Sequence, residues 1–324
     1  MFTGEYLREL TDKAITGLGA SSEADRLFVP VRYILSIGGK RLRPVMCLMA
    51  CNLFRDKIDD AVMPAAGLEV FHNFTLVHDD IMDRADIRRG SPTVHTKWGS
   101  DQAILSGDVM AFLATECIGH APDKVLPKAL KLFNRTAIEV CVGQQLDMDY
   151  EKKGVVTTGE YLRMIELKTA VLVAASLRMG AIIGEASEKD QDLLYEFGRS
   201  LGMAFQIQDD VLDTYGDTKK FGKKTGNDIV TNKKTYLLVR ALETAGGEKL
   251  RQLRKLIETT DGNAEEKITT VRSIFDELEI RLEAENLAYD YFNRAFRALD
   301  QVSVNDERKN ELKQLAVNLI GRVK

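Results

Sequence analysis

The sequence contains few residues that interrupt helices. Only six of its 324 residues are proline, and all six lie within the first 127 residues. Because proline breaks the interior of a helix, the rest of the chain lacks the strongest obstacle to long helices. Apolar residues recur there at helical spacings, as at Leu162, Ile165 and Leu172, whereas the alternation typical of a strand is scarce. These features predict an all-α protein.

Paired cysteines and long apolar runs are also missing. The sequence has four cysteines, Cys47, Cys51, Cys117 and Cys141. None of them form a Cys-x-x-Cys pair, so we expect reduced, mostly buried thiols rather than a disulfide or a zinc site. The longest apolar stretch, residues 169–184, is interrupted by Arg178 and is shorter than the roughly 20 residues of a membrane-spanning helix. The N-terminal residues do not resemble a secretion signal, so we expect a cytoplasmic protein without a transmembrane segment.

The charge is nearly balanced, with 45 basic and 49 acidic residues and a net charge of −4. No global field therefore favours nucleic acid or an anionic membrane as a partner, and any anion site must be local. A hydrophobic content of 44% supports a substantial core, and no linker divides the chain. We expect one domain over residues 1–324 with about ten or more helices. Thr157 and Glu160 have the spacing of a capping box, which predicts a helix start.

Two short acidic motifs stand at the ends of apolar stretches, Asp79-Asp80-Ile81-Met82-Asp83 and Asp209-Asp210-Val211-Leu212-Asp213. On a helix, the first and last aspartates of each motif share a face. Two unit charges 4 Å apart repel by roughly 4 kcal/mol at an effective dielectric constant of about 20, so such clusters call for a cation. Oxygen ligands favour Mg²⁺, which completes its shell with water and substrate phosphates. The apolar neighbours indicate that the acids point into a cleft, and the repeated pattern indicates two helices that face one cavity.

Basic residues cluster near both motifs. Gly38-Gly39-Lys40-Arg41-Leu42-Arg43-Pro44 precedes the first motif, and Arg88-Arg89-Gly90 and a polar loop at residues 84–96 follow it. A second polar loop, residues 216–235, follows the second motif and contains six lysines. Acids that hold Mg²⁺ beside cations that hold phosphate oxygens indicate a diphosphate site. The alternative, surface ion pairs, is our expectation for Lys219, Lys220 and Lys234.

Two other site types have partial matches. Gly222-Lys223-Lys224-Thr225 is similar to the end of a nucleotide-binding P-loop, but the first glycine of that motif is absent and the segment follows a helix. His72, His78 and Asp79 could suggest a metal phosphohydrolase, yet six residues on a helix turn the two histidines apart. For His78 we expect a supporting or packing role.

In these residues the chain resembles the trans-isoprenyl diphosphate synthases. The resemblance covers about Ser36 to Leu238 and rests on the glycine and arginine motif at residues 38–44, both acidic motifs, Arg88-Arg89-Gly90, Lys168-Thr169 and Phe205-Gln206. It implies an all-α, isoprenoid-synthase-type bundle around a central cavity. It also implies Mg²⁺, three ions with substrate bound, and a homodimer.

The resemblance assigns roles to individual residues. It implies that Asp79, Asp83 and Asp209 bind Mg²⁺ and that Asp80 and Asp213 support the metal cluster. The allylic diphosphate would be bound by Arg88, Lys168, Lys223 and Lys233, and isopentenyl diphosphate by Lys40, Arg43, His72 and Arg89. Thr169 and Gln206 would lie near the reacting carbons, where they and Lys168 would take part in catalysis. The implied reaction is head-to-tail condensation of isopentenyl diphosphate with an allylic diphosphate.

The resemblance also implies that product length depends on bulk about one turn before the first motif. Phe74 and Thr75 stand five and four residues before Asp79, and Phe71 flanks the same path. We therefore expect a short-to-medium all-trans product, with C20 ahead of C15, unless Met110 or Phe112 forms the floor instead. Two alternatives remain open, namely a terpene cyclase or head-to-head synthase of the same fold, and a noncatalytic partner subunit.

Overall fold

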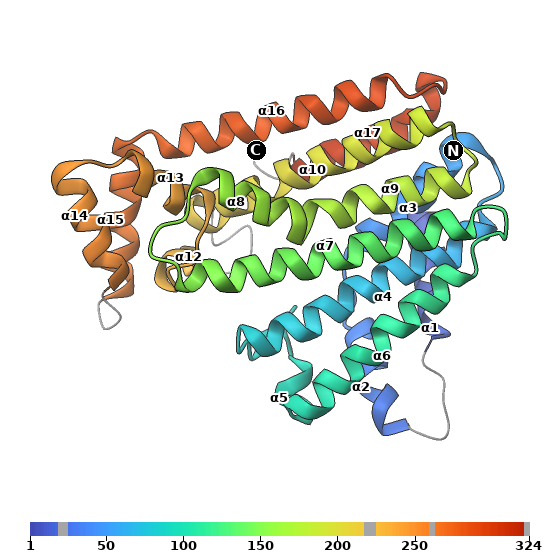
Figure 1. The fold of residues 1–324 in the computed structure, drawn as a ribbon, viewed down its shortest axis with the longest axis horizontal. Coiled ribbons are helices and arrows are strands. Elements are labelled where there is room, and N and C mark those ends of the chain that lie inside the picture. Colours follow the sequence, from blue (N-terminus) through green and yellow to red (C-terminus); the bar gives the residue numbers. More distant parts are fainter. Residues whose placement is uncertain (19–24, 217–224, 259–262, 321–324) are drawn as a thin grey trace. The chain divides into compact units, whose positions relative to one another are not determined.

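The computed structural model describes residues 1–18, 25–216, 225–258 and 263–320 (Figure 1). Its regular structure is almost entirely helical, which confirms the all-α prediction. The elements up to the middle of the chain are α1 (Gly4–Thr16), α2 (Asp25–Ser36), α3 (Leu42–Phe54), α4 (Asp59–Met82), β1 (Ile87–Arg88), β2 (Ser91–Pro92), α5 (Val94–Trp98), α6 (Ser100–Gly119) and α7 (Leu126–Lys152). The later elements are α8 (Thr158–Ile165), the π-helix η1 (Glu166–Ala170), α9 (Val171–Ile183), α10 (Glu188–Tyr215), α12 (Asn227–Val230), α13 (Tyr236–Thr244), α14 (Gly247–Glu258), α15 (Ala264–Glu277), α16 (Ile280–Asp300) and α17 (Asp306–Ile320).

The chain forms two compact units. The first comprises Met1–Thr136, Leu172–Tyr195 and Leu299–Leu315, and the second comprises Ala137–Val171, Glu196–Ala298 and Ala316–Lys324. Helices α7, α10, α16 and α17 contribute to both units. A single domain over residues 1–324 stays a prediction. The first acidic motif belongs to the first unit and the second motif to the second.

The first unit is built on α3, α4 and α6, and α4 and α6 lie side by side (Figure 1). Fully buried side chains such as Leu48, Leu68 and Ile118 form its core. Burying one such side chain stabilises the fold by about 1.5–3 kcal/mol. Gly67 permits the close approach of α4 to α6, because a Cβ there would lie 2.8 Å from the carbonyl oxygen of Ala114. This packing fixes α4, whose C-terminal end carries the first acidic motif.

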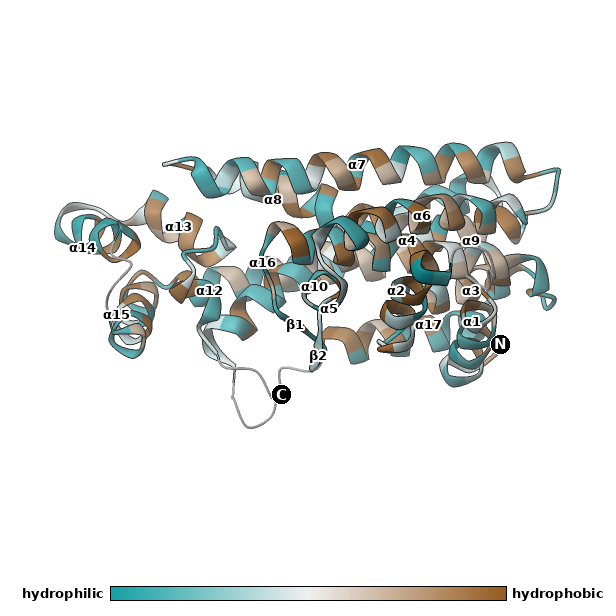
Figure 2. Ribbon diagram, turned by 90° about the horizontal axis from the view of Figure 1, so that it is seen from below, coloured by the Kyte–Doolittle hydropathy of each residue, from teal (hydrophilic) through white to brown (hydrophobic). Residues whose placement is uncertain are grey.

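The second unit has its own core. Met203, Ile207 and Val211 recur every four residues on α10 and pack with Tyr161 of α8 and Phe275 of α15, among others. In Figure 2, α7 carries both polar and apolar residues along its length, as expected for a helix that buries one face. Because the buried stripe of α10 runs through residues 203, 207 and 211, Asp209 is left on the exposed side of the helix.

Local signals in the sequence agree with the helix starts. The capping box is confirmed, since the Thr157 hydroxyl accepts from Glu160 N–H while the Glu160 carboxylate accepts from Thr157 N–H. Residues 84–96, expected to be a loop, contain the hairpin of β1 and β2 and the start of the short helix α5. Of the second polar loop, residue 216 and residues 225–235 are described.

Two further expectations concerned the cysteines and membrane-spanning helices. All four cysteines are free thiols, with Cys47, Cys51 and Cys117 buried and Cys141 exposed. Within the described ranges, none of the helices has the length and apolar content that crossing a bilayer would require.

Candidate functional site

The first acidic motif forms the last turn of α4. The Asp83 N–H donates to the Asp79 carbonyl over 2.8 Å, so the helix continues through the motif and places the two side chains on one face. Asp79 is half-buried and Asp83 is exposed, whereas Asp80 is only 1% exposed. The motif therefore presents two carboxylates outward and one inward.

The inward carboxylate holds an arginine. Both oxygens of Asp80 accept from Arg88, with three N···O distances between 2.7 and 2.9 Å. Such a bidentate, charge-assisted pair fixes the guanidinium strongly. Sequence reasoning placed Asp80 in support of the metals and Arg88 on the allylic diphosphate. In the structure both carboxylate oxygens of Asp80 accept from Arg88 and so orient it.

Arg89 reaches the glycine-rich segment of the first unit. Its backbone has a φ of 51°, and its guanidinium donates to the carbonyl of Gly38. A Cβ on Gly39 would lie 2.8 Å from Arg89 Nη1, so glycine is required for this approach. The exposed side chain of Lys40 follows directly in the chain.

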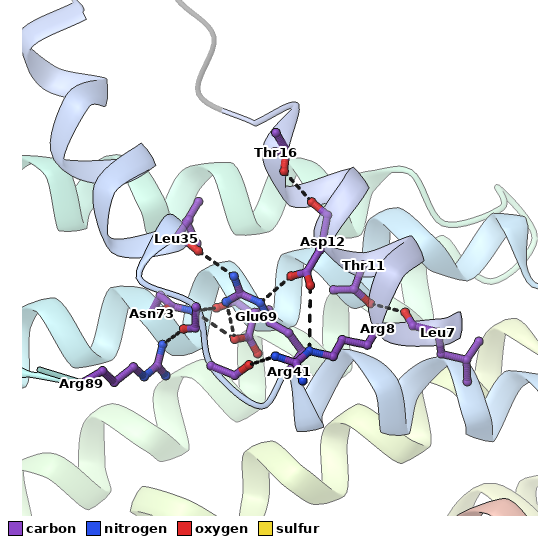
Figure 3. Close-up of polar contacts among 12 residues, drawn as sticks. Leu7, Arg8, Thr11, Asp12, Thr16, Leu35, Arg41, Glu69, Asn73 and Arg89 are labelled. Atoms are coloured by element: carbon purple, nitrogen blue, oxygen red, sulfur yellow. Dashed lines mark hydrogen bonds and ion pairs between the residues drawn. The ribbon is translucent and has the colours of Figure 1, made fainter. Parts of the chain in front are cut away.

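Arg41 has a structural role. Figure 3 shows its side chain between Asp12 and Glu69. Arg41 donates to Asp12 Oδ1 at 2.9 Å, to Glu69 Oε1 at 3.0 Å and to the carbonyl of Leu35 at 2.6 Å. It is 5% exposed and Glu69 is 2% exposed, so this is a buried ion pair that shapes the turn before α3. The sequence showed three cations in this motif but did not reveal that the middle one faces inward.

Arg43 and His72 lie in an electropositive environment. The Nε atom of Arg43 is buried and lacks a hydrogen-bond partner among the described residues. Burial, together with the charges of Arg43, Arg89, Arg88 and Arg41, holds the pKa of His72 well below its usual range. Four arginines whose charges all act on one histidine make this part of the first unit suited to an anion. Three of the four residues expected to bind isopentenyl diphosphate, Arg43, His72 and Arg89, therefore interact electrostatically. The fourth, Lys40, is not among the charges that act on His72.

The residues expected to control product length form an aromatic group in the same unit. The rings of Phe71 and Phe74 are 5.4 Å apart, and Phe133 contacts Phe71 edge-on at 5.4 Å. The Phe74 ring also lies 4.8 Å from His78. Thr75 turns its hydroxyl back to the carbonyl of His72. His78 Nε2 lies 3.2 Å from the Ile104 carbonyl, which agrees with the supporting role expected for it.

The second acidic motif lies near the C-terminal end of α10 and has the same division into outward and inward carboxylates. Asp209 is exposed, Asp213 is half-buried and Asp210 is 4% exposed. Asp210 accepts from the Tyr161 hydroxyl, from Tyr236 N–H at 2.9 Å and from Gln206 Nε2 at 3.2 Å. Burial raises the pKa of Asp210 to about 7, although these three donors oppose the rise.

Lysines after the second motif differ in their surroundings. Asp213 accepts from the N–H of Asp228 at the start of α12, and Lys233 is exposed. Lys234 was expected to be a surface ion-pair residue, and that prediction is wrong, because its side chain is 9% exposed. Burial lowers its pKa. Lys223, Lys219 and Lys220 lie outside the described residues.

Lys168 and Thr169 belong to η1. Lys168 Nζ donates to Asp147 Oδ2 at 2.5 Å, and the Thr169 hydroxyl donates to Gln206 Oε1 at 3.2 Å. Extra residues in a π-helix often mark functional positions. The structure thus brings Thr169 and Gln206 together as the resemblance implied. The sequence did not indicate Asp147 or Tyr161, since isolated polar residues on helices carry no distinctive signal.

The donor chemistry of both motifs fits Mg²⁺ that shares its shell with phosphate. Each motif offers carboxylates at helical spacing, which are hard oxygen ligands. Among the described residues, however, no group of three His, Cys, Asp or Glu side chains converges to hold an ion unaided. Asp79 and Asp83 of the first motif and Asp209 and Asp213 of the second are the residues that would hold Mg²⁺, whose shell is usually completed by water and substrate phosphates.

Comparison with known proteins identifies the family of the chain. The model of the polyprenyl synthetase family matches residues 24–275. The chain is 37% identical to a short chain isoprenyl diphosphate synthase of Methanocaldococcus jannaschii over 92% of this chain and 90% of that protein. It is 38% identical to a geranylgeranyl diphosphate synthase of Methanosarcina mazei over 96% of this chain and 94% of that protein. A crystal structure of a geranylgeranyl pyrophosphate synthase, 40% identical, superimposes with a TM-score of 0.94 over 100% of both chains. With two aspartate motifs, arginines held beside one of them and a lysine-threonine pair near the other, the chain belongs to the polyprenyl synthetase family, that of the trans-isoprenyl diphosphate synthases.

Proposed function

We propose that this protein condenses isopentenyl diphosphate head-to-tail with an allylic diphosphate and releases a short all-trans prenyl diphosphate and inorganic diphosphate. The observation that carries the proposal is a group of cations in the first unit. The Arg89 guanidinium donates to the carbonyl of Gly38, and the Nε atom of Arg43 is buried without a partner among the described residues. The charges of both arginines lower the pKa of His72. Another arginine, Arg88, is held by Asp80 beside the outward carboxylates of α4. One anion site next to a second anion site with metal ligands is what two diphosphate substrates require.

The two substrates are assigned to different cations. Isopentenyl diphosphate would bind to Lys40, Arg43, His72 and Arg89. The allylic diphosphate would bind to Arg88, Lys168, Lys223 and Lys233, with Asp79, Asp80, Asp83, Asp209 and Asp213 in the metal site or its support. Forked guanidinium groups suit phosphate oxygens, and lysines add point charge.

The reaction begins when the allylic C–O bond breaks and its electron pair leaves with the diphosphate. Bound Mg²⁺, three ions in our proposal, supplies positive charge that stabilises this leaving group. Arg88 and Lys168 add to that stabilisation, while the Gln206 carbonyl and the Thr169 hydroxyl oxygen face the allylic cation. The π electrons of the isopentenyl double bond form the new C–C bond. The released diphosphate then takes a proton from the adjacent carbon, which restores a double bond.

Incorporation of labelled isopentenyl diphosphate tests this function. Purified protein with Mg²⁺ and dimethylallyl, geranyl or farnesyl diphosphate is expected to yield a longer prenyl diphosphate. A cyclised or head-to-head product would instead support the other activities of this fold. The variants Asp79→Ala and Asp209→Ala are expected to lose turnover and to keep the wild-type circular dichroism spectrum. Full activity in either variant, or no incorporation by the wild type with any primer, would refute the proposal.

Product length is proposed to be C20 ahead of C15. Phe74 packs between Phe71 and His78 one turn before Asp79, so its ring is placed to stop a growing chain. The relatives named as geranylgeranyl synthases support the longer of the two products. Phe74→Ala is expected to lengthen the product in a thin-layer or mass-spectrometric assay. Met110 is fully buried and is the alternative residue that could limit chain length. Met110→Ala is the matched test, because a longer product in this variant would assign that limit to Met110.

We also propose a homodimer. Ile104, Leu105 and Phe112 of α6 are 45%, 53% and 76% exposed, and apolar side chains grouped on one helix favour burial against a partner. Light scattering on the wild type is expected to give twice the mass of the chain, and Leu105→Asp is expected to lower it to that of a monomer. A wild-type mass equal to one chain would contradict the dimer.

A further inference from the structure

Tyr161 is a fully enclosed tyrosine with a polar role. Its side chain is 2% exposed on α8, and its ring packs against Tyr236 with 6.4 Å between centroids. A buried phenolic hydroxyl needs a partner. That partner is Asp210 Oδ2, to which Tyr161 donates.

Asp210 in turn determines which way the amide of Gln206 points. Asp210 Oδ2 accepts from Tyr161 and Tyr236 N–H, which leaves Oδ1 for Gln206 Nε2 at 3.2 Å. Both oxygens of Asp210 accept in this arrangement, Oδ1 from Gln206 Nε2, so the NH₂ side of the amide faces Asp210. The carbonyl oxygen of Gln206 consequently faces the other way, where it accepts from the Thr169 hydroxyl at 3.2 Å.

The direction of this amide matters for a cationic intermediate. A carbonyl oxygen stabilises nearby positive charge, while an NH₂ group in the same place destabilises it. Reversing the amide would therefore change the sign of its contribution. The hydrogen-bond series from Tyr161 through Asp210 to Gln206 and Thr169 prevents that reversal.

We infer that Tyr161 is a positioning residue for prenyl transfer, which acts through Asp210 to keep the Gln206 carbonyl directed at the reacting carbons. The inference rests on the proposed function for the place of Gln206 beside the substrate. Tyr161 itself touches no substrate in this scheme. Its removal is thus expected to affect the chemical step more than substrate binding.

The test compares two tyrosines of one aromatic pair. Tyr161→Phe removes the hydroxyl that holds Asp210, whereas Tyr236→Phe removes a hydroxyl bonded to Glu283 and keeps the backbone N–H on Asp210. Tyr161→Phe is expected to lower kcat about tenfold with both KM values within about twofold of wild type. Tyr236→Phe is expected to keep kcat. Equal losses in both variants, or a loss confined to KM, would overturn the inference.

A double-mutant cycle separates positioning from general damage. If Tyr161 acts through Gln206, Tyr161→Phe has no further effect on kcat in a Gln206→Ala background. Additive losses would show that Tyr161 acts by another route.

A second readout does not depend on turnover. In protein labelled with ¹⁵N-glutamine, the side-chain amide signal of Gln206, assigned by its loss in Gln206→Ala, is expected to shift in Tyr161→Phe and to stay in place in Tyr236→Phe. An unchanged signal in Tyr161→Phe would refute the hydrogen-bond series. A shifted signal in a protein that incorporates no isopentenyl diphosphate would support the series and refute the proposed function alone.

Discussion

Asp80 differs from the other aspartates of its motif because its carboxylate is buried against Arg88. In Asp80→Asn the guanidinium loses its charged acceptor, and hydrogen bonds to charged groups contribute about 1.5–3 kcal/mol. We therefore expect the free energy of unfolding to fall by about 2 kcal/mol, and the KM for the allylic diphosphate to rise about tenfold because Arg88 is no longer oriented. Urea denaturation and steady-state kinetics measure the two effects.

Asp83→Asn is the matched control within the same motif. Asp83 is exposed at the end of α4, so its replacement is expected to reduce turnover without a measurable change in stability. Equal losses of stability in the two variants would contradict the division into outward and inward carboxylates.

His72 makes stability depend on pH. Its pKa in the folded protein is well below the usual value because of burial and the surrounding arginines. Below about pH 6.5 the unfolded chain therefore binds a proton at this residue that the folded protein does not bind. The free energy of unfolding should fall as the pH decreases through this range, by up to about 1.4 kcal/mol per pH unit from this residue.

Comparing variants isolates this contribution. Denaturation curves between about pH 6.5 and 5 are expected to show a shallower slope in His72→Gln than in the wild type. His120→Gln, at an exposed position after α6, controls for the loss of a histidine and should keep the wild-type slope. Identical slopes in His72→Gln and the wild type would contradict the buried, neutral state of His72.

Single residues also mark the limit of sequence-based prediction. The acidic motifs and the arginines were proposed as site residues because their types and spacing have a direct chemical meaning, and their roles stay predictions. The inward roles of Asp80 and Arg41 were not, because the sequence does not state which charges are buried together. Lys234 was misassigned for the same reason, since nothing in a run of lysines distinguishes the one that is covered.

At the level of elements, the position of η1 depends on a glycine in α7. A Cβ at Gly143 would lie 2.3 Å from the backbone nitrogen of Lys168 and 2.7 Å from the carbonyl carbon of Leu167. Because these are backbone atoms, Gly143→Ala must displace η1 and with it Lys168 and Thr169. We expect a loss of about 1–3 kcal/mol in stability, typical of overpacking, together with a reduced kcat.

Gly159 provides the comparison, since a Cβ there meets no atom within 4 Å. It lies in α8, where alanine is favoured over glycine by up to about 1 kcal/mol. Gly159→Ala is therefore expected to keep kcat and to raise the melting temperature slightly. A wild-type melting temperature and kcat in Gly143→Ala would show that η1 does not depend on this close approach.

The regular helices could be predicted from the sequence, whereas the π-helix could not. The capping box at Thr157 and the apolar spacing of α8 and α10 depend on neighbours along the chain, and the sequence shows these directly. The π-helix depends on tertiary contacts, such as that of Gly143 with Lys168, which lie 25 residues apart. No local pattern encodes such contacts.

At the level of the molecule, each compact unit carries one aspartate motif and its own cations. The fold class followed from the scarcity of proline and the helical spacing of apolar residues, and the family from the order of motifs along the chain. All of these can be read from the linear sequence. The division into two units cannot, since no change of composition accompanies a chain that passes between them several times.

This distribution of ligands predicts that metal and diphosphate bind together. Because no three acidic or histidine side chains of the described chain converge on one point, Mg²⁺ alone is expected to bind weakly. Inorganic diphosphate alone would meet arginines and lysines but also the negative charge of the aspartates. A ligand at 100 times its Kd stabilises the folded state by about 2.7 kcal/mol, so joint binding should be visible in thermal unfolding. We expect the rise in melting temperature with both ligands to exceed the sum of the two separate rises.

The same experiment examines whether both motifs serve one ligand cluster. Asp79→Ala and Asp209→Ala lie in different units, so if their carboxylates share the ions that a diphosphate brings, each variant alone should remove the excess rise. Arg240→Ala, whose side chain pairs with Glu283 in the second unit, controls for the loss of a charged residue and should keep it. The opposite result would be that Asp209→Ala keeps the full excess rise in melting temperature while Asp79→Ala loses it. That result would show that the second motif does not contribute to the ligand cluster. The contribution of the second unit to the reaction would then come from Lys168, Thr169 and Gln206.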